Sequence, residues 1–121
     1  MNQNKYECVK DDFRILSETK KLLTYVDSYI CENFPKNKKH LKVLLFDECK
    51  SLYMSIVRAN ITSGNIRSKH QIDALCSISF IDYIIGYLYD LKIIINRRYS
   101  STTRILSNLE LMIRKWMVWK E

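Results

Sequence analysis

Residues 72–96 constrain the fold of this chain more than any other stretch, because a helix made from them is apolar on nearly every face. At 3.6 residues per turn, their large apolar side chains point in all directions. These side chains are Leu75, Ile78, Phe80, Ile81, Ile84, Ile85, Leu88, Leu91, Ile93, Ile94 and Ile95. Such a helix must be enclosed by other helices, by another subunit or by lipid.

Charged residues argue against lipid. Asp82, Asp90 and Lys92 lie in this stretch, and a charge near the centre of a membrane costs about 2.5 to 3.5 kcal/mol. We therefore expect no membrane span. We expect Asp73, Asp82 and Asp90 to fall within about a third of a turn of one another. One polar seam on an apolar helix indicates burial on two sides, inside a bundle and against another chain. The interface residues that we expect are Asp82, Tyr83, Tyr87 and Asp90.

The rest of the chain has the composition of a helical protein. It has 121 residues with only two glycines and one proline, too few for the turns of a sheet protein. A chain of this length is expected to be a single domain, residues 1–121, that buries a core without disulfides or metal. The first ten residues are polar and are expected to fray.

Apolar residues at helical spacing predict four helices. We expect the first over residues 13–33, with Asp11 or Asp12 as its cap, and the second over residues 40–61. Gly64 is suited to the left-handed conformation that ends a helix, and Ser68 or a neighbour would open the long apolar helix. The fourth would begin at residues 100–102 and run past Trp116. Four such helices predict an all-α, up-down-up-down four-helix bundle that forms an oligomer.

The charge balance points to an acidic partner. There are 20 Lys and Arg against 13 Asp and Glu, a formal charge of +7, which favours nucleic acid, an anionic membrane or an acidic protein. The first and third turns of an antiparallel bundle meet at one end. The cations expected there, as a nucleic-acid site, are Lys36, Lys38, Lys39, Lys42, Lys92, Arg97, Arg98 and Arg104, with only Asp90 nearby. A secondary basic patch is expected at the other end, from Arg58, Arg67, Lys69, Arg114, Lys115 and Lys120.

Two tyrosines extend this hypothesis. Tyr99 and Tyr53 could stack on exposed bases, as aromatic side chains of single-strand binders do. The other interpretation is that each covers the core and keeps its hydroxyl in water.

No motif for catalysis or for a cofactor is present. Cys8, Cys31, Cys49 and Cys76 contain no CxxC pair that would indicate zinc or redox chemistry. His40 and His70 lack a partner at ligand spacing, and no phosphate loop or nucleophile elbow occurs. Without a signal peptide at its start, the chain is expected to be cytoplasmic, with reduced thiols that are either packed or idle. We expect a non-enzymatic protein without metal or cofactor.

From Phe34 onward the sequence resembles the Avd accessory proteins of diversity-generating retroelements and the related four-helix-bundle proteins of ribosomal intervening sequences. The matching features are Phe34-Pro35-Lys36 between the first two helices, Asp90-Leu91-Lys92 closing the third, Arg98-Tyr99 in the next turn, and Trp116. The resemblance implies a basic homopentamer, barrel shaped, that binds DNA or RNA and assists a reverse transcriptase in mutagenic retrohoming.

Two positions depart from that family. Its third helix commonly carries arginines about eight and four residues before the closing aspartate, where this chain has Asp82 and Gly86. The glycine pair before the tryptophan is here Arg114-Lys115. The first departure leaves a second hypothesis open: an oligomeric structural or interaction bundle that does not bind nucleic acid.

Overall fold

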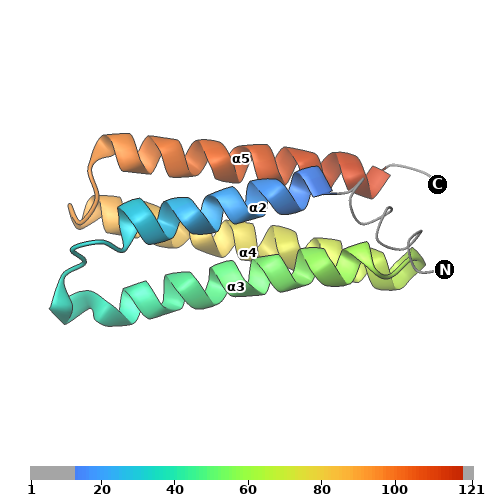
Figure 1. Cartoon of the computed structure of the whole chain (residues 1–121), viewed down its shortest axis with the longest axis horizontal. Helices are drawn as coiled ribbons and strands as arrows, with labels where there is room; N and C mark the ends of the chain where they lie inside the picture. The colour runs from blue at the N-terminus through green and yellow to red at the C-terminus, as the bar shows by residue number, and fades with distance from the viewer. Residues whose placement is uncertain (1–12, 119–121) are drawn as a thin grey trace.

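The computed structural model describes residues 13–118. Four α-helices run along one long axis: α2 (Phe13–Tyr25), α3 (Lys39–Asn60), α4 (Gly64–Asp90) and α5 (Asn96–Val118) (Figure 1). No strand occurs between residues 13 and 118, so the predicted all-α class is confirmed. The predictions for the first ten residues, Asp11, Asp12 and Lys120 concern positions outside the described residues.

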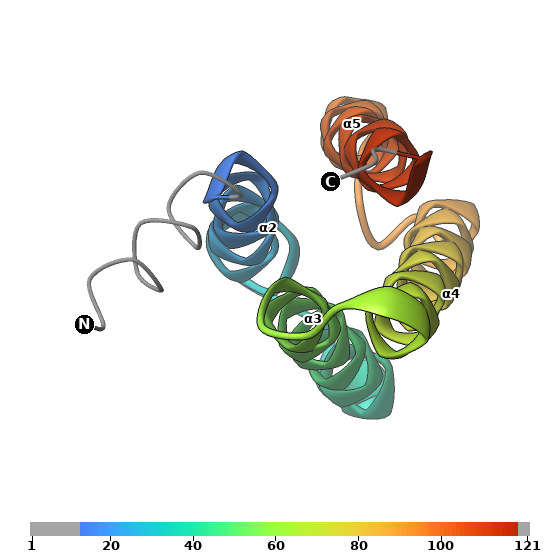
Figure 2. The same ribbon diagram turned by 90° about the vertical axis from the view of Figure 1, so that its right-hand side faces the viewer.

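The helices surround one core. Seen end on, they lie at four corners, with each helix beside the next in the chain and α5 beside α2 (Figure 2). The α2–α3 and α4–α5 connections lie at one end, and the α3–α4 connection lies at the other (Figure 1). The core side chains include Leu22, Leu45, Leu52, Ile81, Ile85, Leu88, Leu109 and Ile113.

The closest pair of helices is α3 and α4. Ser55 and Ala59 on α3 and Ala74 and Ser77 on α4 are all buried. Small side chains at these positions let the two backbones approach, which increases the van der Waals contact between them.

The first helix ends differently from the prediction. After Tyr25 the chain continues as a π-helix, η1 (Val26–Ile30), in which the Cys31 amide donates to the Val26 carbonyl at 2.9 Å. The helix ends before Asn33, which has a φ of 59°. Asparagine tolerates this left-handed conformation better than most residues. A short 3-10 turn, η2 (Lys36–Lys38), then leads into α3.

The long apolar helix is shifted toward the N-terminus. The predicted opening near Ser68 is wrong, because α4 begins at Gly64. Gly64 does have a left-handed φ of 63°, but it starts α4 instead of ending α3. At the other end α4 stops at Asp90, and Ile94 turns back into the core. The end at Asn96 expected from the apolar run is therefore also wrong, whereas the end at Asp90-Leu91-Lys92 expected from the family resemblance is confirmed.

The fourth helix starts earlier than predicted. It begins at Asn96, so residues 100–102 lie inside it and do not cap it. The Thr102 hydroxyl donates to the Arg98 carbonyl at 2.7 Å. Threonine can form this bond to the carbonyl four residues earlier within a helix. Thr102 is therefore an interior residue of α5 and not its N-cap.

By length and composition alone, α4 is apolar enough to cross a membrane; its most apolar window has a mean hydropathy of 1.4, and 39% of that window is buried in the bundle. The other helices bury one face of α4. This face includes Ile78, Ile81 and Ile85. The opposite face of α4 remains exposed on the four-helix bundle.

Candidate nucleic-acid interface

We call the bundle end that contains residues 31–38 and 91–98 the basic end. Its cations come from two connections that the fold brings together (Figure 1). Lys36, Lys39 and Arg97 are exposed, and none of them forms an ion pair within the described residues. Lys38, Lys42 and Arg98 are half-buried. Arg104 is exposed about two turns into α5, so it lies on the side of the bundle and not at its end.

The lysines of the first connection line an open groove. Lys36, Lys39 and Lys42 share this groove with the side chain of the half-buried Phe34, and Cys31 lies at its base. Three ammonium groups around one depression provide a positive potential that can hold a phosphate. Burial raises the pKa of the Cys31 thiol to about 11, so this thiol stays neutral.

Lys92 supplies a cation from the second connection. The Ile93 amide donates to the Leu88 carbonyl and the Lys92 amide to the Tyr89 carbonyl, both at 2.9 Å. This pair of bonds is the Schellman motif, which ends a helix with a left-handed residue. Lys92 is that residue, with a φ of 64°. Lysine in this conformation costs about 1 to 2 kcal/mol, so an exposed cation is kept here at the expense of stability.

Aromatic rings accompany the arginine of the second connection. The Arg98 guanidinium lies 4.3 Å from the centroid of the Tyr29 ring, and the Tyr25 ring lies 4.8 Å from the same ring. Arg98 thereby attaches the first turn of α5 to η1. The neighbouring Tyr99 stacks on Tyr89 of α4 with centroids 4.5 Å apart. Tyr99 is half-buried, as is Tyr53 on α3, so both stacking candidates also cover core.

The basic end holds more acid than the sequence predicted. Besides Asp90, the exposed Asp27 and Glu32 lie here, and both line a groove with Lys42. The prediction that Asp90 is the sole carboxylate nearby is therefore wrong, because η1 and the residues after it bring Asp27 and Glu32 to this end. Without Arg104, seven predicted cations still outnumber three carboxylates.

We call the opposite end of the bundle, around residues 60–67, the capped end, because Arg67 donates hydrogen bonds to the last carbonyls of α3 there. The Arg67 Nε donates to the Ala59 carbonyl at 2.8 Å, and its guanidinium lies 5.6 Å from the Trp116 ring centroid. A terminal nitrogen of the same side chain reaches the Asn60 carbonyl at 3.4 Å. These carbonyls belong to the last turn of α3, where no intrahelical donor is available. Arg67 is therefore a structural cation.

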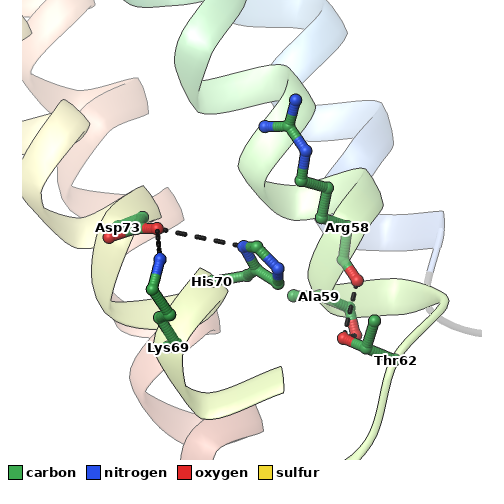
Figure 3. A network of polar contacts seen from close by, with 6 residues as sticks. All are labelled: Arg58, Ala59, Thr62, Lys69, His70 and Asp73. Atoms are coloured by element: carbon green, nitrogen blue, oxygen red, sulfur yellow. Dashed lines mark hydrogen bonds and ion pairs between the residues drawn. The ribbon is translucent and has the colours of Figure 1, made fainter. Parts of the chain in front are cut away.

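Other cations of the predicted secondary patch are also engaged. Lys69 lies 3.4 Å from the Asp73 carboxylate, and His70 lies 3.8 Å from the same oxygen (Figure 3). Arg114 pairs with Glu110 at 3.0 Å. Arg58 and Lys115 are exposed. Charges already paired within the chain contribute less to phosphate binding, so the basic end is the stronger candidate.

The exposed face of α4 carries an aromatic row. Phe80 and Tyr83 stack with centroids 6.3 Å apart, as do Tyr83 and Tyr87. Tyr83 is 66% exposed. Asp82 and Asp90 are also exposed, with Asp82 about a third of a turn away from this row. The four predicted interface residues thus lie on the side of α4 that the subunit leaves uncovered.

The expected seam of three aspartates is wrong. Asp73 and Asp82 are nine residues apart, about two and a half turns, so they point to opposite sides of α4. Asp73 lines a groove with Asp47 and Ser51 of α3 and is half-buried, whereas Asp82 is exposed.

The remaining candidate residues lie apart from one another. The part of the chain that the structure describes contains no group of three His, Cys, Asp or Glu side chains that could hold a metal ion. Cys31 and Cys49 are buried and Cys76 is exposed, all as free thiols. Burial raises the pKa of the Cys49 thiol to about 12. Neutral, packed thiols are consistent with a structural role for Cys31 and Cys49.

Sequence reasoning missed Tyr29 and Tyr89. Their positions gave no signal, because Tyr29 lies at the end of an expected amphipathic helix and Tyr89 in an apolar run. Each acquires its partner from α5, across the fold. Only the Arg98-Tyr99 pair, singled out by the family resemblance, pointed to this place.

Comparisons of the chain with protein-family models, with curated proteins and with solved structures found no match.

Proposed function

We propose that this chain is a non-enzymatic, basic nucleic-acid-binding protein, an up-down-up-down four-helix bundle that acts in the cytoplasm as a homo-oligomer. On the family resemblance, we further propose that it assists a reverse transcriptase in the mutagenic retrohoming of a diversity-generating retroelement. A reverse-transcriptase gene with paired template and variable repeats beside the gene for this chain would support that role.

The observation that carries the binding proposal is the meeting of two cationic connections at the basic end. Lys36 and Lys39 come from one connection, and Lys92 and Arg97 come from the other. All four are exposed. Phosphates that contact these residues release their counterions, which makes binding favourable and dependent on salt. Contacts of this kind hold the backbone and do not read sequence.

The exposed face of α4 supports self-association. A row of three aromatic rings on one helix is more apolar than the exposed surface of a monomer usually is. The stretch from Phe80 to Tyr87 contains no lysine or arginine, so this row is unsuited to phosphates. We assign this face to protein contact, with another subunit or with the polymerase.

The test is a matched pair of charge reversals. The first variant replaces Lys36, Lys39, Lys92 and Arg97 by Glu at the basic end. The second replaces Arg58, Lys69, Arg114 and Lys115 by Glu. The two variants have the same net charge, and each leaves the core unchanged. The second variant also breaks the exposed ion pairs of Lys69 and Arg114, but such pairs contribute little to stability, so both variants should fold.

We expect the first variant to lose affinity for a mixed-sequence oligonucleotide by about a hundredfold or more at low salt. The second should lose much less, because only long-range attraction changes. Fluorescence anisotropy measures both affinities, and circular dichroism checks folding. Equal losses in the two variants would mean that net charge alone governs binding, and the site would then be wrong.

The second candidate function is an oligomeric interaction bundle without nucleic-acid binding. Asp82 and Gly86 favour it, because they replace the two arginines that the family commonly carries. An unaltered protein that is oligomeric by light scattering, but binds neither DNA nor RNA at low salt, would establish this alternative in place of the first.

A further inference from the structure

The first turn of α5 holds two adjacent residues that each make a ring contact with a different helix. Arg98 lies over Tyr29 of η1, and Tyr99 stacks on Tyr89 near the end of α4. The ring planes of Tyr89 and Tyr99 differ in orientation by only 12°. The fold therefore brings two preformed aromatic contacts to the basic end, one on each side of the same helical turn.

The side chains of Tyr29 and Tyr89, which α5 contacts, both remain accessible to solvent. Tyr29 is 49% exposed and Tyr89 is 37% exposed. A tyrosine that served only to hold α5 in place would gain more stability from deeper burial. The exposed ring surface is available to a flat partner, and the existing contacts have already fixed the ring positions. Less conformational entropy is then lost when such a partner binds.

Cations lie next to the rings along the chain. Lys92 follows Tyr89 by three residues, and Arg97 precedes Arg98. Both side chains are exposed. Flat aromatic surfaces beside positive charges match the two components of a nucleotide strand, because the bases stack and the phosphates carry negative charge.

We propose that the basic end prefers single-stranded to double-stranded nucleic acid, with unpaired bases stacking on Tyr29 and Tyr89. This inference rests on the proposed nucleic-acid function and specifies its substrate class. In a duplex the faces of the bases are covered by neighbouring base pairs, so the two rings can contribute only to a single strand. Duplexes bind through the lysines and arginines alone.

The aromatic row on α4 provides an internal control. Tyr83 is more exposed than either Tyr29 or Tyr89. It lies nine residues before Lys92, however, whereas Tyr89 lies only three residues before that cation. If any exposed tyrosine were sufficient, Tyr83 would contribute as much as Tyr29. On our proposal it contributes nothing to strand binding.

The experiment compares three probes by fluorescence anisotropy at one salt concentration. They are a labelled 15-nucleotide thymidine strand, the same backbone with abasic sites in place of the bases, and a blunt duplex of the same length. The protein variants are Tyr29→Leu with Tyr89→Leu, Tyr29→Phe with Tyr89→Phe, and Tyr83→Leu as the control.

We expect the unaltered protein to bind the thymidine strand at least tenfold more tightly than the abasic strand. The double Leu variant should lose tenfold or more for the thymidine strand and change little for the duplex. The double Phe variant, which keeps both rings, and Tyr83→Leu should bind like the unaltered protein.

Two results would overturn the inference while leaving the proposed function intact. One is equal binding of the thymidine and abasic strands by the unaltered protein, which needs no variant to fold. The other is a parallel loss for strand and duplex in a folded double Leu variant, which would mean that the rings only position α5. If the unaltered protein bound no probe at all, both the inference and the proposed function would fail.

Discussion

The two ends of the bundle use the same kinds of residue for opposite purposes. At the capped end, the left-handed position is occupied by Gly64, with a φ of 63° and no steric cost. At the basic end the corresponding conformation is occupied by Lys92, with a φ of 64°. Arg67 at the capped end donates to carbonyls of α3, whereas Arg97 at the basic end is exposed. One end is built for stability, and the other keeps charge in solvent.

This difference offers a criterion for distinguishing a proposed binding surface from an ordinary charged surface. Counting lysines and arginines does not distinguish the ends, because both carry several. What distinguishes them is whether the cations have partners within the chain and whether the backbone is strained to present them. The left-handed residue 92 completes the Schellman motif that ends α4, but a glycine would complete it without strain, so the lysine there suggests a function.

Replacement of the two arginines should produce the largest difference in stability. Arg67→Ala removes hydrogen bonds from a charged donor to two carbonyls and a contact with Trp116, so we expect a loss of about 2 to 3 kcal/mol in the free energy of unfolding. Arg97→Ala should change it by less than about 0.5 kcal/mol and should weaken nucleic-acid binding. Urea denaturation of both variants measures the difference. Similar losses would contradict the contrast between the two ends.

Much of the fold could be predicted from the sequence, because apolar spacing is a local property. The second helix was placed within a residue at each end, at Lys39–Asn60 against residues 40–61. The start of α4 was not found, and its end at Asp90 followed from the family resemblance and not from apolar spacing. A left-handed lysine at position 92 ends this helix, and glycine, the usual signal for such an end, is missing there. The π-helix η1 likewise has no pattern of its own in the sequence.

The candidate site was predicted only in part, for a similar reason. The cations of the two connections were found because the order of helices decides which turns share an end. The role of Arg67 was missed, because its acceptors lie on the preceding helix and depend on how α3 and α4 meet. The contacts of Tyr29 and Tyr89 were missed because both partners come from α5.

The left-handed lysine provides the next test. Lys92→Gly should raise the free energy of unfolding by about 1 kcal/mol, because glycine adopts this conformation without strain. The same substitution should weaken binding by a few fold, because one phosphate contact is lost. Lys92→Ala is the matched control: it removes the charge but keeps the strain, so its binding should fall equally while its stability stays near that of the unaltered protein.

Thermal or urea unfolding, together with anisotropy, measures both quantities. A Lys92→Gly protein that is no more stable than Lys92→Ala would show that residue 92 carries no strain in solution. Unchanged binding in both variants would remove Lys92 from the interface while leaving the other cations of the basic end in place.

The smallest effect is expected at Gly86, and it concerns the space beside α4. A Cβ added at this position meets nothing within 4 Å inside the subunit. Since glycine within a helix is less favourable than alanine, Gly86→Ala should stabilise the fold by about 0.5 to 1 kcal/mol. Gly64→Ala, the matched control, should destabilise it by about 1 kcal/mol because its φ is left-handed. Urea unfolding monitored by circular dichroism measures both.

The sign of the Gly86 effect also reports on the exposed face of α4. If the protein is an oligomer by light scattering and Gly86→Ala stabilises it, the subunit contact lies over the aromatic row and leaves Gly86 uncovered. If Gly86→Ala destabilises the oligomer while a dilute monomer gains stability, a second subunit must approach Gly86 closely, because no atom of its own chain is near enough to resist the added methyl group. A loss of stability in the monomer itself would contradict the open space beside this residue.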